Sequence, residues 1–293
     1  MSAAEIVRSL SFVAWSEVRT ALTSVRVVAF ASMFGFPTVL LAYALGGAAV
    51  GGAPVTFPLW RLGPDGALLA LAYGFAPILL PAIPLGLAYD VAKRDLRSGY
   101  PETVLTRPVP RWSVALGRTV GLLAACSVLI LIVDAASIAA LSGATGAAAS
   151  AGTIAAFVGG TLILGALYLS TGLVLLVVLT PSQFAWLSLP LWAYHHAVRP
   201  LGLVIAGQFL QILPIKGPVV FAAAWSDLGT FTGICMGFLA PFAAPGAGLV
   251  FLPSVVDLSG SIAFTAVSLA GLPLIGLLVI LYLAAVSRMP LGR

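Results

Sequence analysis

Long apolar stretches alternate with short charged ones along the 293-residue chain. A helix needs about 20 mostly apolar residues to cross a bilayer. Each uncharged stretch is long enough for at least one crossing, and the longest has room for more than one. These stretches are 27–60, 66–89, 135–198, 228–256 and 258–287. The pattern predicts an all-α integral membrane protein.

The first 26 residues follow a different pattern. On a helix at 100° per residue, Arg8, Arg19 and Arg26 fall within about 20° of one another, and aliphatic side chains such as Leu10 and Val13 take the other side. This predicts an amphipathic helix at the membrane surface over 1–26, with arginines reaching lipid phosphates and aliphatic groups at the acyl boundary. A cleaved signal peptide is disfavoured, because the charges recur and no short apolar core precedes them.

Six transmembrane spans are predicted in a single domain over 1–293. They lie at 27–49, 66–89, 118–141, 153–179, within 184–212, and at 260–286. Prolines and Asp227 interrupt the apolar region 217–254, which predicts re-entrant helices at the outer face before the last span. With both termini cytoplasmic, eleven of the fourteen basic residues lie inside. The positive-inside rule therefore favours six spans in a cell inner membrane over seven.

Composition narrows the class of function. Charged residues make up 8% of the chain and hydrophobic ones 61%, whereas a soluble domain carries about 25% charged residues; a soluble enzyme is therefore excluded. The net charge of +5 gathers beside apolar stretches, which indicates contact with membrane lipid and not with nucleic acid. Cys126 and Cys235 form no CxxC pair and predict no disulfide framework.

The strongly charged stretch 90–118 carries nine charges in 29 residues. Pro101 and Glu102 suit the first turn of a short helix, Leu105 gives it an apolar edge, and Pro108 ends it. The pattern predicts a cytoplasmic loop that contains this short amphipathic helix. A loop whose charges only set the topology is the alternative.

This stretch resembles the permease subunits of ABC-2 type ATP-binding-cassette exporters. In that family an acidic-basic cluster is followed by Gly, a hydrophobic turn, Pro, Arg and Leu-Gly-Lys. The matching positions here are Asp95, Gly99, Leu105, Pro108, Arg111, Leu116, Gly117 and Arg118. This sequence departs from the pattern with Asp95 in place of Glu, Tyr100 in place of Thr and Arg118 in place of Lys.

The N-terminus resembles the same family. Trp15, Glu17 and Arg19, followed by Leu22 and Arg26, are similar to its interfacial "elbow" helix. The layout of elbow helix, six spans and basic loop after the second span agrees as well. The order of motifs also resembles the permease that serves copper-site maturation of nitrous-oxide reductase.

The resemblance implies that the segment 93–111 couples this chain to a cytoplasmic ABC ATPase subunit. A groove of the ATPase would contact four polar side chains and one apolar one: Asp95, Arg97, Glu102, Arg111 and Leu105. Two copies of the permease, most simply a homodimer, would line the path. This chain would be non-catalytic and bind no cofactor, with ATP and Mg on the partner. In agreement, the sequence has no G-x-x-x-x-G-K-[ST] loop.

Two polar features in apolar sequence support an alternative, a proton-coupled secondary transporter. Asp134 is costly at membrane depth; it lines a substrate or proton path, or it lies near the outer headgroups. His195, His196 and Arg199 form the other cluster. Adjacent histidines on a helix point about 100° apart, so no metal site is predicted. The two halves show no convincing inverted repeat, and no catalytic residues of a membrane-embedded enzyme converge.

Overall fold

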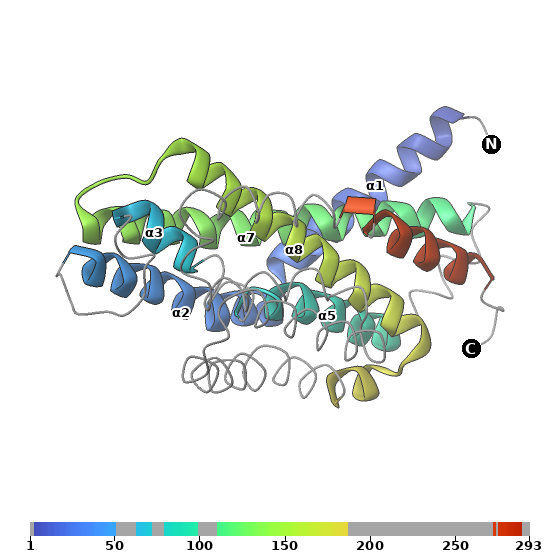
Figure 1. The fold of residues 1–293 in the computed structure, drawn as a ribbon. Coiled ribbons are helices and arrows are strands. Elements are labelled where there is room, and N and C mark those ends of the chain that lie inside the picture. The colour runs from blue at the N-terminus through green and yellow to red at the C-terminus, as the bar shows by residue number, and fades with distance from the viewer. Residues whose placement is uncertain are drawn as a thin grey trace, which may run out of the picture.

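The computed structural model describes residues 3–50, 63–71, 79–98, 110–186, 272–273 and 275–288. These residues are almost entirely helical and contain no strand, which confirms the all-α prediction. The helices are α1 (Ala3–Thr23), α2 (Val25–Val50), α3 (Gly63–Ala70), α5 (Ala82–Ser98), α7 (Arg111–Thr145) and α8 (Ala151–Val178) (Figure 1). A further apolar helix spans Ile275–Arg288.

Three of the described helices are long and apolar enough to cross a membrane: Val25–Gly47, Arg111–Thr145 and Ala151–Val178. They coincide with the predicted first, third and fourth spans. At 1.5 Å per residue the 35 residues of α7 extend about 52 Å, against a hydrocarbon core of about 30 Å. Helix α7 is therefore much longer than one crossing requires.

Helix α7 is the centre of the described bundle: it contacts both α2 and α1, and α8 returns antiparallel to it (Figure 1). Gly35 of α2 meets Val133 of α7, and Gly46 meets Ala144. Both pairs have the same separation in sequence, so α2 and α7 run in the same direction. Helix α1 leaves the bundle at an angle toward the N-terminus (Figure 1).

The contact between α1 and α7 depends on two glycines. A Cβ atom at Gly117 would lie 2.8 Å from the Leu10 carbonyl oxygen, and one at Gly121 would meet the Ala14 carbonyl oxygen. These distances are too short for any side chain, so only glycine lets the α1 backbone approach this closely. The aliphatic side of α1, predicted to face the acyl boundary, thus contacts α7 through Leu10, Val13 and Ala14.

A short turn of small residues, 146–150, joins α7 to α8. Gly146 ends α7 in the left-handed region with φ of 67°, and its N–H donates to the Ser142 carbonyl. Ser150 caps α8 by accepting from the Thr153 N–H at 3.3 Å. The Ser150 N–H in turn donates to Asp65 of α3 at 2.7 Å. The turn is therefore fixed by caps on both helices and by a third helix.

Helices extend into the charged stretch 90–118 from both sides. Helix α5 continues through Ser98 and α7 begins at Arg111, so only 99–110 lies between the two helices. Lys and Arg are good helix formers, and their charged groups can remain hydrated on a helix surface while the backbone stays hydrogen-bonded. The polar composition therefore did not mark the end of the helix.

Several predicted elements lie outside the described residues. They are the re-entrant region 217–254 and nearly all of the fifth span within 184–212. The predicted second span 66–89 corresponds to α3 and the first half of α5, with 72–78 outside the described part. The predicted last span is represented by the helix Ile275–Arg288. The count of six spans stays a prediction.

Candidate functional site

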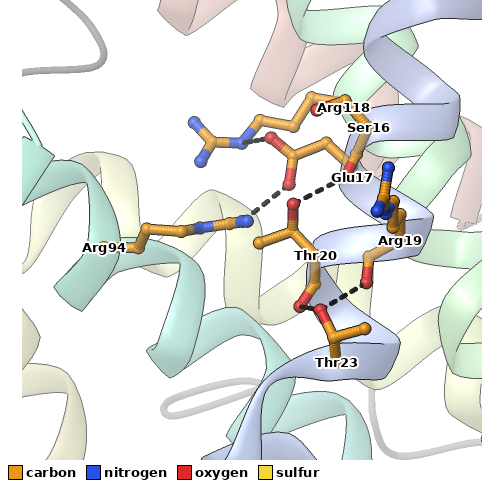
Figure 2. A network of polar contacts seen from close by, with 7 residues as sticks. All are labelled: Ser16, Glu17, Arg19, Thr20, Thr23, Arg94 and Arg118. Atoms are coloured by element: carbon orange, nitrogen blue, oxygen red, sulfur yellow. Dashed lines mark hydrogen bonds and ion pairs between the residues drawn. The ribbon is translucent and has the colours of Figure 1, made fainter.

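A cluster of charged side chains joins α1, α5 and α7. The buried Glu17 carboxylate of α1 accepts a hydrogen bond from Arg94 of α5, with 2.6 Å between Nη2 and Oε2. Its other oxygen forms an ion pair with Arg118 of α7, with 3.4 Å between Nε and Oε1. Figure 2 shows the two arginines converging on this one carboxylate from different helices. We call these three residues the Glu17 junction.

The local sequence explains how Glu17 reaches this position. Leu10, Ala14 and Glu17 are spaced four and three residues apart, so they share one face of α1. That face lies against Gly117 and Gly121 of α7, and the packing brings Glu17 beside Arg118. The carboxylate is thus carried into the interface by the same close approach that the glycines permit.

Burial makes the junction energetically important. The side chain of Glu17 is 5% exposed and that of Arg118 is 11% exposed, whereas Arg94 keeps 26% of its surface in contact with solvent. A buried charge is tolerated when it is paired and hydrogen-bonded, and removing one partner from such a pair costs about 3–5 kcal/mol. Glu17 therefore holds the three helices in one relative position.

A second ion pair lies one helical turn away on α5. Asp90 and Arg94 are four residues apart and share a face. The Arg26 guanidinium, at the start of α2, contacts the Asp90 carboxylate at 3.4 Å between Nη1 and Oδ1. Only Ser24 separates α1 from α2. This face of α5 therefore forms ion pairs both with Glu17, before Ser24, and with Arg26, after it.

Other polar contacts in the same region are local. The Thr20 hydroxyl donates to the Ser16 carbonyl at 2.7 Å, and the Thr23 hydroxyl donates to the Arg19 carbonyl at 2.8 Å (Figure 2). These bonds lie within α1 and connect no other helix. The connection between helices at this point therefore depends on the charged side chains.

The predicted site residues differ in their surroundings. Glu17 and Arg26 take part in ion pairs, while Arg8 and Arg19 are exposed on α1. Asp95 and Arg97 belong to the last turn of α5, and Arg111 begins α7. The remaining residues of the predicted ATPase contact lie outside the described part of the chain: Gly99, Glu102, Leu105 and Pro108.

Sequence reasoning did not single out Asp90 or Arg94, and it gave Arg118 no partner. One signal was present: Glu17 is a carboxylate on the aliphatic side of an amphipathic helix, where a charge needs a partner. Asp90 and Arg94 also share i, i+4 spacing, which places both on one face. Neither signal identifies which helix supplies the partner.

The intramembrane carboxylate Asp134 is fully buried. Thr161 of α8 lies 2.6 Å from it, between Oγ1 and Oδ2. The other carboxylate oxygen and the hydroxyl of Ser137, one turn along α7, have no hydrogen-bond partner among the described residues. Asp134 therefore lies inside the α7–α8 interface. Its depth in the membrane, on a substrate or proton path or near the outer headgroups, stays a prediction.

The polar cluster of His195, His196 and Arg199 lies outside the described residues. In the part of the chain that is described, no three His, Cys, Asp or Glu side chains gather as a metal site would require. Cys126 is buried and free.

Comparison with known proteins finds no family whose model matches this sequence and no curated protein that matches it. Function is therefore inferred from the residues and their contacts.

Proposed function

We propose that this chain is the membrane-spanning, non-catalytic permease subunit of an ABC-2 type exporter whose ATPase is a separate chain. The observation that supports this most directly is the Glu17 junction. Arg94 and Arg118 lie on the two helices that flank the segment 99–110, and both bind one carboxylate on α1. A partner that moves this segment would therefore also move α1.

The proposed architecture has six spans and re-entrant helices within 217–254. The protein lies in the inner membrane, with both termini in the cytoplasm. The segment 93–111 contacts the ATPase, which binds ATP and Mg. Support comes from the end of the bundle where α5 finishes and α7 starts. Charged residues of α5 continue to its last turn there, and Arg111 opens α7.

The proposed transmission uses the helices as rigid rods. Helix α7 exceeds the hydrocarbon thickness by about 22 Å, which is enough for its first turns, including Arg118, to stand outside the hydrocarbon. ATP-driven closure of two ATPases would push 99–110 in each of two permease copies. The Glu17 junction would pass that displacement to α1, and the continuation of the chain through Ser24 would pass it to α2. Such a shift exchanges two arrangements of the bundle, as alternating access requires.

Co-purification with the ATPase encoded beside this chain tests the proposal. Wild type in mild detergent is expected to retain the ATPase, whereas Leu105→Glu with Arg111→Glu is expected to be folded but alone. Glu17→Gln is expected to retain the ATPase while the permease no longer changes its rate of ATP hydrolysis in proteoliposomes. Glu5→Gln removes an exposed glutamate of the same helix and serves as the matched control. Wild type that binds no ATPase would refute the proposal.

A second candidate is a proton-coupled secondary transporter that uses Asp134 with His195, His196 and Arg199. The specific observation in its favour is the fully buried Asp134 with one oxygen unpaired among the described residues. An ionisable group inside a membrane protein marks a functional site by default. This candidate predicts uptake driven by a pH gradient without any ATPase, and loss of that uptake in Asp134→Asn.

A further inference from the structure

One face of α1 combines arginines with exposed aromatic side chains. Phe12 is 70% exposed and Trp15 is 68% exposed, and Arg8 and Arg19 are exposed beside them. At 100° per residue these four side chains fall within about 60° of one another. We call them the arginine–aromatic stripe.

The stripe lies opposite the packed face of α1. Leu10, Ala14 and Glu17, which meet α7, are centred about 180° away from it on the helix. Leu10, Val13 and Ala14 thus pack against α7, and the large apolar side chains of α1 that remain exposed are Val7, Phe12 and Trp15, the last two among the arginines. Two large aromatic side chains bury about 150–250 Å² each when they are covered, so an open Phe12 and Trp15 indicate a partner.

Continuity with α2 identifies the kind of partner. The exposed large side chains of α2 include Met33, Phe36 and Leu40, and no charged residue occurs from position 27 to the end of that helix. This is the composition of a helix surface in contact with hydrocarbon. Because only Ser24 separates α2 from α1, the stripe begins where that apolar surface ends. A mixture of aromatic and basic side chains directly beyond an apolar helix surface is typical of the headgroup region.

We propose that the arginine–aromatic stripe is a binding surface for anionic phospholipid headgroups. Arg8 and Arg19 are about 16 Å apart along the helix, far enough to engage separate headgroups. Each guanidinium presents two parallel N–H donors that match a phosphate, while Phe12 and Trp15 insert at the boundary between headgroups and acyl chains. The inference goes beyond the proposed function and holds whether or not an ATPase binds.

The charges of α1 favour anionic over zwitterionic lipid. Glu17 faces the other side, where Arg94 and Arg118 neutralise it. Glu5 is the remaining acidic residue of α1 and lies at the edge of the stripe, about 50° from its centre. The four residues of the stripe carry two positive charges, and the exposed Glu5, one turn before Arg8, opposes them with one negative charge. Each basic residue near an anionic membrane surface contributes about 1 kcal/mol to binding, which corresponds to about fivefold in affinity.

Native mass spectrometry of the full chain, released from mild detergent, tests the proposal. Phosphatidylglycerol and phosphatidylcholine with the same acyl chains compete for the protein, and the ratio of their first binding constants is measured. Wild type is expected to prefer phosphatidylglycerol. Arg8→Gln and Arg19→Gln are each expected to lower the ratio about fivefold, and Glu5→Gln is expected to raise it. Arg288→Gln removes an exposed arginine outside the stripe and is expected to lower the ratio less than either stripe variant.

Two further variants separate charge from shape. Arg8→Lys with Arg19→Lys keeps the charge and is expected to retain most of the preference, whereas Phe12→Ser with Trp15→Ser is expected to weaken binding of both lipids without changing the ratio. The proposal is overturned if wild type binds both lipids equally. It is also overturned if Arg8→Gln and Arg19→Gln have no larger effect than Arg288→Gln, the result expected if the stripe contacts another protein.

Discussion

Replacing Glu17 by glutamine removes the carboxylate that Arg94 and Arg118 share, while it keeps the size of the side chain and one oxygen acceptor. The hydrogen bond from Arg94 at 2.6 Å can be retained by the amide oxygen. The counter-charge of Arg118 is lost. The variant therefore isolates the electrostatic part of the Glu17 junction from its packing.

The expected cost follows from the exposure of each arginine. The Arg118 side chain is 11% exposed, so water replaces little of the lost interaction, and breaking a buried pair costs about 3–5 kcal/mol. Arg94 is 26% exposed and adds less, because solvent screens it. We expect Glu17→Gln to lower the free energy of unfolding by about 3 kcal/mol. Arg26→Gln should cost less than about 1 kcal/mol, because Arg26 is 46% exposed and lies 3.4 Å from Asp90.

A double-mutant cycle sharpens this test. Unfolding of Glu17→Gln, Arg118→Gln and the double variant is measured in mixed micelles by titration with a denaturing detergent. Because the double variant removes both charges of the more buried pair and leaves only the partly exposed Arg94 without the carboxylate, its cost should be smaller than the sum of the single costs by at least about 1 kcal/mol. Equal costs for Glu17→Gln and Arg26→Gln, or strict additivity in the cycle, would refute the buried-pair reasoning.

Three other predictions follow from separate contacts. Gly121→Leu should separate α1 from α7 and destabilise the protein by about 3 kcal/mol or more, because a side chain there meets the α1 backbone. Gly143→Ala lies in a helix with open space around it and should be neutral or stabilising by up to about 1 kcal/mol. Thermal unfolding compares the two variants. Asp134→Asn should change the unfolding free energy by less than about 1 kcal/mol, because the amide oxygen still accepts from Thr161, and a loss above about 3 kcal/mol would show that the charge itself stabilises the interface. Asp65→Ala should cost about 1 kcal/mol by removing the 2.7 Å bond to the Ser150 N–H, seen as faster hydrogen exchange at the start of α8.

The sequence was sufficient to predict the three long apolar helices, because each coincides with a long uncharged stretch. The spans predicted at 27–49, 118–141 and 153–179 correspond to α2, α7 and α8, because a bilayer demands a continuous apolar run whatever the tertiary structure. The end of α5 was missed for the opposite reason. Charged residues such as Lys93 and Arg94 are compatible with both a helix and a loop, so composition did not separate the two.

The contacts between helices were not predictable in the same way. Glu17 and Arg94 are 77 residues apart, and their pairing depends on which helices become neighbours. The sequence indicates that a carboxylate on the aliphatic face of α1 needs a partner, but Arg94, Arg97 and Arg118 are equally basic. The close approach of α1 to Gly117 and Gly121 brings Arg118 to Glu17, and the position of α5 beside α1 brings Arg94.

The long separation between Glu17 and its arginines has a consequence for biosynthesis. Glu17 leaves the ribosome 77 residues before Arg94, which at about 5–20 residues per second is a delay of about 4–15 s. During that interval the aliphatic face of α1 has no α7 to cover it and carries a carboxylate without its partners. The Glu17 carboxylate of the nascent chain must therefore stay hydrated until α5 and α7 are made, so α1 is synthesised before the helices that it packs against and docks late.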